Sequence, residues 1–135
     1  MEAPFGGEPF PCLLWHRGGF TRDAKRDLAH ALIHGGCRYA VCAGVECEAW
    51  HDAFDAAFLE EHEGQSEDES DRDFMMTTWH ERDTIDDVAF FFVLNTNFDD
   101  HDFTRYLVLH VGDAPVPDEI NAAVAHYAMG GLRPN

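Results

Sequence analysis

The chain is poor in basic residues. It has only nine lysines and arginines among its 135 residues, against 26 aspartates and glutamates, so its formal net charge at pH 7 is −17 and its pI is near 4.6. Proteins that bind DNA, RNA or anionic lipids through a basic face neutralise the phosphates with lysine and arginine. The charge balance therefore argues against a nucleic-acid partner or a membrane surface bound through a basic face.

Long apolar segments are also missing. The longest unbroken apolar run is Val88 to Leu94, whereas a helix that crosses a membrane needs about 20 apolar residues. The first eight residues contain no lysine or arginine and no apolar stretch, so we expect no secretory signal. Apolar residues still make up 45% of the chain, which is enough for a core. We expect a cytoplasmic protein with one domain over residues 1–135.

The four cysteines lack the CxxC spacing that is typical of zinc ribbons and thioredoxin-type redox sites. A chain of 135 residues with an adequate core does not need disulfides for stability. Cys12 and Cys42 lie inside apolar, strand-like runs, where a free cysteine behaves as a small hydrophobic residue. The sequence therefore predicts reduced thiols.

Four short apolar runs alternate with four segments of helical periodicity. The runs are residues 10–15, 38–43, 74–79 and 105–111. Runs that are apolar on both faces are typical of parallel strands covered by helices on both sides. We expect an α/β fold, a single small doubly wound domain of four mainly parallel strands in the flavodoxin-like order 2-1-3-4. Pro11 cannot donate to a ladder, which predicts that the first strand begins late or lies at an edge.

The helical segments carry their own signals. Thr21 is the expected N-cap of the first helix, and Thr84 that of the third, with Asp87 three residues further on. The third helix is apolar almost all round, which indicates deep burial or a second contact surface.

One segment stands out by its charge. Residues 60–73 contain eight carboxylates and a single basic residue, Arg72. A block of like charges repels itself and usually forms a solvated loop. We expect an acidic loop at residues 60–73, and the alternative is a docking surface for a basic partner.

Three stretches of the chain resemble a known family. They are Cys37-Arg38-Tyr39 with Ala43-Gly44, Cys47 and Trp50-His51-Asp52; the string Met75-Met76-Thr77-Thr78-Trp79-His80; and Leu107 to Asp113. These residues are similar to those of a family of small bacterial proteins of unknown function, the DUF7684-like proteins. The resemblance covers roughly residues 37 to 113 and implies relatedness without an activity.

Chemistry in an open parallel sheet is expected beyond the carboxyl ends of its strands. The segments that follow the four predicted strands are 16–19, 44–47, 78–80 and 110–113. They would bring three histidines and one cysteine to the same edge from four parts of the chain.

Cys47 is the centre of two hypotheses about this edge. It lies one turn before His51 at the start of a predicted helix, and the helix dipole lowers the pKa of a thiol at that position. With His80 or His110 as base, Cys47 would be a catalytic nucleophile. Alternatively, Cys47, His51, His80 and His110 would bind zinc. The simpler alternative is that Cys47 packs under the helix while the histidines hydrogen-bond the backbone.

A third site is predicted at the loop after the first strand. Free N–H groups at a helix N-terminus favour anions, and four basic residues lie nearby in the sequence: Arg17, Arg22, Lys25 and Arg26. A phosphate or nucleotide is the expected ligand, although an exposed basic helix face is the simpler interpretation. The residues that we assign to ligand binding here and at the neighbouring strand ends are Arg17, Gly18, Gly19, Thr78, Trp79 and Asp113.

Three functional hypotheses follow. The first is a protein-binding module, immunity- or antitoxin-like, that docks a basic partner through its acidic surface. The second is a small enzyme or metal-binding protein that uses the Cys/His cluster. The third is a sensor of nucleotides or phosphate ligands at the first loop. The basic first helix and the acidic remainder also make a homo-oligomer conceivable.

Overall fold

The computed structural model describes residues 3–64, 74–97, 103–112 and 118–133. Strands and helices alternate along these residues, as the sequence predicts. Their bounds are β1 Phe10–His16, α1 Arg22–His34, β2 Cys37–Gly44, α2 Cys47–Glu61, β3 Met76–His80, α4 Ile85–Leu94, β4 Leu107–Val111 and α5 Asp118–Ala128.

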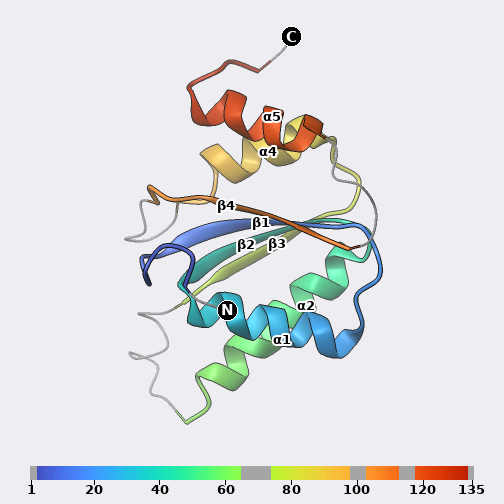
Figure 1. The fold of residues 1–135 in the computed structure, drawn as a ribbon, viewed down its shortest axis with the longest axis vertical. Helices are drawn as coiled ribbons and strands as arrows, with labels where there is room; N and C mark the ends of the chain where they lie inside the picture. Colours follow the sequence, from blue (N-terminus) through green and yellow to red (C-terminus); the bar gives the residue numbers. More distant parts are fainter. Residues whose placement is uncertain (1–2, 65–73, 98–102, 113–117, 134–135) are drawn as a thin grey trace.

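The four strands form one parallel sheet in the order β3-β2-β1-β4. The doubly wound α/β fold is therefore confirmed, but the predicted order 2-1-3-4 is wrong, because β1 has β4 rather than β3 as its second neighbour. Crossovers between parallel strands are right-handed. Since the chain advances from β1 to β3 in one direction and then returns to β4, the crossover helices α1 and α2 cover one face and α4 covers the other. The last helix, α5, follows β4 and packs beside α4 (Figure 1).

Each face of the sheet has its own core. Under α1 and α2 the largest fully buried side chains are Trp50, Phe10, Phe54, Leu14 and Leu32. Under α4 and α5 they are Phe92, Leu13, Ile120, Val41 and Val88. A sheet buried on both faces needs strands that are apolar at successive positions, which explains the continuous apolar runs of β1 and β2.

Pro11 lies in a central strand, against the prediction of a late or edge strand. β1 begins at Phe10 and pairs with both β2 and β4. The register with β2 shifts between Phe10 and Pro11, and β4 pairs only from Cys12 onward. Pro11 is tolerated because it lies where one neighbour is absent and the ladder to the other is irregular.

The two predicted helix N-caps, Thr21 and Thr84, are confirmed. The hydroxyl of Thr21 accepts a hydrogen bond from the N–H of Ala24, and that of Thr84 accepts one from Asp87, both at 3.1 Å. The helix α4 is apolar almost all round because it packs on the sheet, including its edge strand β3, and also on α5. Phe90 packs on Tyr127 of α5, and Phe91 packs on His80 of β3.

The predicted acidic loop begins too early. Glu60 and Glu61 are the last residues of α2 and face α1, where they pair with Arg26, His30 and His34 at 2.6 to 3.0 Å. The hydrogen bond to Glu61 raises the pKa of His30. Residues 65–73 of the predicted loop lie outside the described residues.

No helix in the described part of the chain combines the length and the apolar character that a membrane crossing requires.

Candidate functional site

The end of β1 is closed over by the loop between β2 and α2. His16 is 1% exposed, and its Nδ1 donates to the carbonyl of Val45 at 2.8 Å. The N–H of Val45 in turn donates to the carbonyl of His16 at 3.0 Å. Gly44 permits this approach, because its φ is +84° and a Cβ there would lie 2.2 Å from the carbonyl oxygen of His16.

The predicted ligand loop after β1 is packed against β4. The N–H of Arg17 donates to the carbonyl of Val111 at 2.7 Å, and a Cβ on Gly112 would lie 2.4 Å from the carbonyl oxygen of Gly18. Arg17 has two buried guanidinium nitrogens, Nε and Nη2, for which the described residues offer no hydrogen-bond partner. Gly19 continues the loop with a φ of +87°. Asp113, assigned to the same ligand site, lies outside the described residues.

Cys47 is a buried thiol at the first position of α2, with 3% of its surface exposed. The sequence predicts a lowered thiol pKa there, and this is wrong: burial raises the pKa of Cys47 above its ordinary value. Backbone N–H groups, including that of His80, favour the thiolate, but removal from water outweighs them. The raised pKa therefore does not support Cys47 as an activated nucleophile.

The four proposed zinc ligands are not brought together. Cys47 and His51 lie on the α2 side of the sheet, where the ring of His51 packs on Trp79 at 4.5 Å. The ring of His80 lies on the other side, against α4, and His110 bonds Asn121 of α5 at 3.1 Å. Among the residues that the structure describes, no three Cys, His, Asp or Glu side chains converge as a metal site.

Strand order and side-chain alternation explain this separation. β3 and β4 are the two edges of the sheet, so His80 and His110 lie three strand spacings, or about 14 Å, apart. Successive side chains point to opposite faces, so Thr78 and His80 share the α4 side and bond each other at 3.0 Å. The backbone N–H of His80 therefore faces Cys47, while its ring Nδ1 lies 2.7 Å from a carboxylate oxygen of Asp83.

The burial of the cysteines makes a direct prediction about thiol chemistry. All four are free and buried, and burial raises the pKa of Cys37 to about 12. We expect the folded protein to resist labelling by a thiol-specific disulfide reagent at pH 8 over minutes, and the protein in concentrated urea to react at four thiols. Rapid labelling of Cys47 alone in the folded state would contradict this expectation and restore the nucleophile hypothesis.

An ion pair between the buried Lys25 and the exposed Glu46 lies near the end of β1 and was missed by sequence reasoning. Lys25, expected on the exposed basic face of α1, is 6% exposed. Its ammonium donates to the carbonyl of Phe20 at 3.4 Å and to the carboxylate of Glu46. Lys25 precedes buried Ala29 and Leu32 by four and seven residues, and this helical spacing was the signal available.

Glu46 holds an unusual backbone conformation in this pair. It is the N-cap residue of α2 with a φ of +55°, the one non-glycine residue with positive φ in the described part of the chain. Its side chain makes no capping bond and reaches Lys25 instead. The hydrogen bond from Lys25 lowers the pKa of Glu46. No local sequence signal marks a glutamate for this conformation.

The edge strand β3 exposes apolar side chains. Trp79 is 43% exposed and Met76 is 37% exposed. Trp79 projects on the α2 side beside His51, which lies 3.3 Å from Asp52 and 3.6 Å from Asp55. Of the predicted ligand residues, Thr78 and Trp79 therefore lie on this edge, at the opposite side of the sheet from β4.

One comparison with known proteins identifies a family. A family model described as a domain of unknown function, DUF7684, matches residues 1–127. The match is longer than the stretch from 37 to 113 that carries the resemblance in the sequence, and it includes β1, α1 and most of α5. No curated protein and no solved structure shows significant similarity to the chain.

Proposed function

The chain belongs to the DUF7684 family, a domain of unknown function, and we propose that it is a protein-binding module. In this proposal the open edge of β3 accepts an extended, basic segment of a partner protein as an additional strand. The observation that carries the proposal is the exposure of Trp79 and Met76 on an edge strand that is flanked by carboxylates. A basic toxin or nuclease bound in this way would make the chain immunity- or antitoxin-like.

The backbone of β3 supports strand addition. β3 pairs with β2 on one side, and no other strand of the described residues pairs with its outer side. Edge strands are usually protected by lysine, proline, bulges or a covering segment, and β3 contains neither lysine nor proline. Strand addition supplies main-chain hydrogen bonds for affinity and side-chain contacts on both faces for specificity.

The side chains of β3 offer contacts on both of those faces. Trp79 presents its ring on the α2 side, and Met76, at an alternate position, lies on the α4 side. An added strand would place its own alternate side chains over one or the other. Partly exposed tryptophan is enriched among the residues that dominate binding energy at protein interfaces.

Charge selects the partner. Asp52 and Asp55 lie next to His51, whose ring packs on Trp79. Asp83 pairs with His80 at the end of β3. Arg82 is the only basic residue of the β3–α4 loop. With a net charge of −17 for the whole chain, long-range attraction favours a basic segment and makes its association rate sensitive to salt.

A titration with synthetic peptides tests the proposal. An eight-residue peptide that alternates lysine and valine is expected to shift the backbone amide NMR signals of residues 76–80, and the affinity is expected to fall as salt rises. The same peptide with glutamate in place of lysine, or with a central proline, is expected to bind at least tenfold more weakly.

Trp79→Ala is the decisive variant. Because Trp79 is the largest exposed side chain of the edge, its removal is expected to weaken binding about 30-fold, the effect of a tryptophan hot spot. Leu132→Ala removes another exposed apolar side chain, 86% exposed and beyond α5, and should leave affinity unchanged. Equal affinities for the two variants, or signal shifts spread over the acidic surface without β3, would overturn the proposal.

A further inference from the structure

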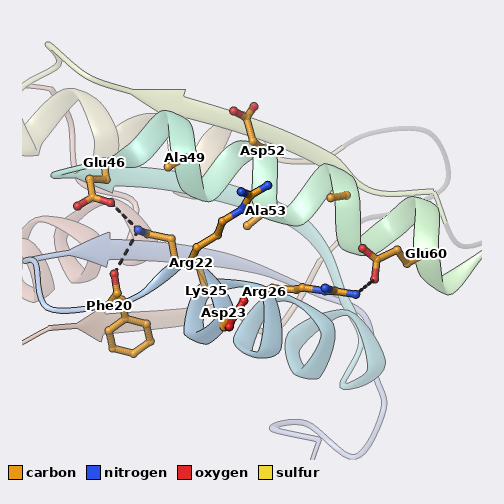
Figure 2. Close-up of a pocket in the computed structure, with 11 residues that line it drawn as sticks. Phe20, Arg22, Asp23, Lys25, Arg26, Glu46, Ala49, Asp52, Ala53 and Glu60 are labelled. Carbon is orange, nitrogen blue, oxygen red and sulfur yellow. Dashed lines mark hydrogen bonds and ion pairs between the residues drawn. The ribbon is translucent and has the colours of Figure 1, made fainter.

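Arg17 differs from other basic side chains near the end of β1. Figure 2 shows the ammonium of Lys25 bonded to Glu46. In the same view Arg26 reaches Glu60, so both of these charges are compensated. In Arg17, by contrast, Nε and Nη2 are buried, and no described residue accepts a hydrogen bond from either atom. A buried donor without an acceptor costs free energy, and a ligand that supplies the acceptor removes this cost.

The two unpartnered nitrogens of Arg17 form one edge of the guanidinium group. Along this edge two N–H bonds point in parallel, at a spacing that matches the two oxygens of a carboxylate. A single arginine edge also balances the one negative charge of a carboxylate, whereas a phosphate monoester carries nearly two. A carboxylate is therefore the ligand group that this edge fits best.

His110 lies on the same side of the sheet as Arg17. In the register of β1 and β4, Trp15 is opposite His110, and the ladder continues because the N–H of Arg17 donates to the carbonyl of Val111 at 2.7 Å. Side-chain alternation then places Arg17 on the side of Trp15, which packs in the core under α4 and α5. His110 bonds Asn121 of α5 on that side. One strand spacing across and two residues along put the Cβ atoms of Arg17 and His110 about 8 Å apart.

The ring of His110 supplies a second unpartnered atom. Its Nε2 lies 3.1 Å from Oδ1 of Asn121. Because an amide oxygen only accepts, Nε2 carries the hydrogen, and Nδ1 of the neutral ring is an acceptor. Nδ1 is buried and has no hydrogen-bond partner in the described part of the chain. A hydroxyl group close to the carboxylate of a ligand would donate to it.

The strand connections diverge at this point of the sheet. β1 is followed by α1 on one face, whereas β4 is followed by α5, which lies beside α4 on the other (Figure 1). Ligands of open α/β sheets bind beyond the carboxyl ends of strands at such a point. Space is present here, since a Cβ on Gly18 would meet no atom of the described residues within 4 Å. Arg17 and Gly18 are both only partly buried, so a small molecule can approach the guanidinium from this side.

We propose that the ends of β1 and β4 bind a small hydroxy acid as its carboxylate anion. The carboxylate takes the Nε–Nη2 edge of Arg17, and the hydroxyl donates to Nδ1 of His110. The carbon chain between these groups lies against Trp15, which is partly buried. The inference does not depend on the proposed function, because strand addition at β3 uses none of these residues.

The probe for this site is 3-hydroxybutyrate. Butyrate is the control that lacks the hydroxyl, and methyl 3-hydroxybutyrate is the control that lacks the charge. At pH 7.5 and 150 mM salt, the probe is expected to shift the amide NMR signals of residues 15–19 and 110–112. Butyrate is expected to bind about tenfold more weakly, and the ester to leave these signals unchanged. No shift of these signals at 50 mM 3-hydroxybutyrate, or equal shifts with the ester, would refute the proposal.

Arg17→Lys tests the guanidinium edge. Lysine keeps the charge but cannot form two parallel hydrogen bonds to one carboxylate, so the affinity is expected to fall at least tenfold. Arg22→Ala removes an exposed arginine at the start of α1 and should leave the affinity unchanged. The amide spectra of the free variants establish that each is folded. Equal affinities of the wild-type chain and Arg17→Lys, or an equal loss in Arg22→Ala, would contradict the assignment to Arg17.

His110→Ala tests the contact to the hydroxyl. This variant is expected to bind 3-hydroxybutyrate only as well as butyrate, while its affinity for butyrate stays that of the wild-type chain. A loss of affinity for both acids in equal measure would remove His110 from the site. Asp113 follows Gly112 in the sequence and lies outside the described residues, so Asp113→Asn is the last control and should leave the affinity unchanged. A tenfold gain in this variant would identify the carboxylate of the chain itself as the acceptor for Arg17 and count against a ligand site.

Discussion

Replacing Gly44 with alanine is expected to destabilise the fold by about 4 kcal/mol or more. Gly44 has a φ of +84°, and the new Cβ would lie 2.2 Å from the carbonyl oxygen of His16 and 3.0 Å from its nitrogen. Both atoms belong to the backbone of the central strand, so neither can move without disturbing β1. Urea unfolding followed by circular dichroism measures the effect as a shift of the transition midpoint to lower urea.

Gly64→Ala is the matched control. Gly64 has nearly the same φ, +81°, but no atom of the described residues lies within 4 Å of an added Cβ. The substitution therefore carries only the cost of placing alanine in the left-handed region, about 1 to 2 kcal/mol. Similar midpoints for Gly44→Ala and Gly64→Ala would show that the β2–α2 loop does not close tightly over the end of β1.

Trp50→Ala is expected to cost about 3 to 5 kcal/mol of stability. Trp50 is fully buried, and its ring packs on those of His16, Phe20 and Phe54. Removal leaves a cavity between α2 and the sheet that these rigid neighbours cannot fill. The same urea titration measures this loss of stability. Trp79→Ala, on the exposed edge, should cost less than about 1 kcal/mol.

Trp50→Phe shows which part of the side chain matters. The indole Nε1 of Trp50 is buried and has no hydrogen-bond partner among the residues that the structure describes. Phenylalanine therefore loses volume but no hydrogen bond, and its expected cost is about 1 to 2 kcal/mol. A cost as large as that of alanine would reveal a polar contact to Nε1 and contradict the packing described here.

The local features of the fold and its doubly wound α/β class could be predicted from the sequence, but the order of its strands could not. Thr21 and Thr84 identify their helix starts because a cap depends on residues within one turn. The order of strands depends on which neighbour β1 receives after β3, and right-handed crossovers permit both the predicted order and the observed one. No short-range pattern separates the two.

The wrong strand order also explains why the predicted Cys/His cluster does not form. His80 and His110 both lie at the carboxyl ends of their strands, as expected, but these strands are the opposite edges of the sheet. Lys25 was expected with Arg22 and Arg26 on an exposed basic face of the helix, although its spacing to Ala29 and Leu32 indicates the buried side of α1. No pattern in the sequence predicts the αL conformation of Glu46.

The placement of the cysteines has a consequence for handling and ageing of the protein. All four thiols belong to the core beneath α1 and α2, and none is bonded to another. Any excursion that lifts these two helices uncovers several sulfur atoms at once. An oxidant present at that moment would cross-link pairs that the native packing keeps as thiols, so the chain could not close again. The shelf life of the protein in air is therefore governed by how often that layer opens, and a reducing agent should extend it.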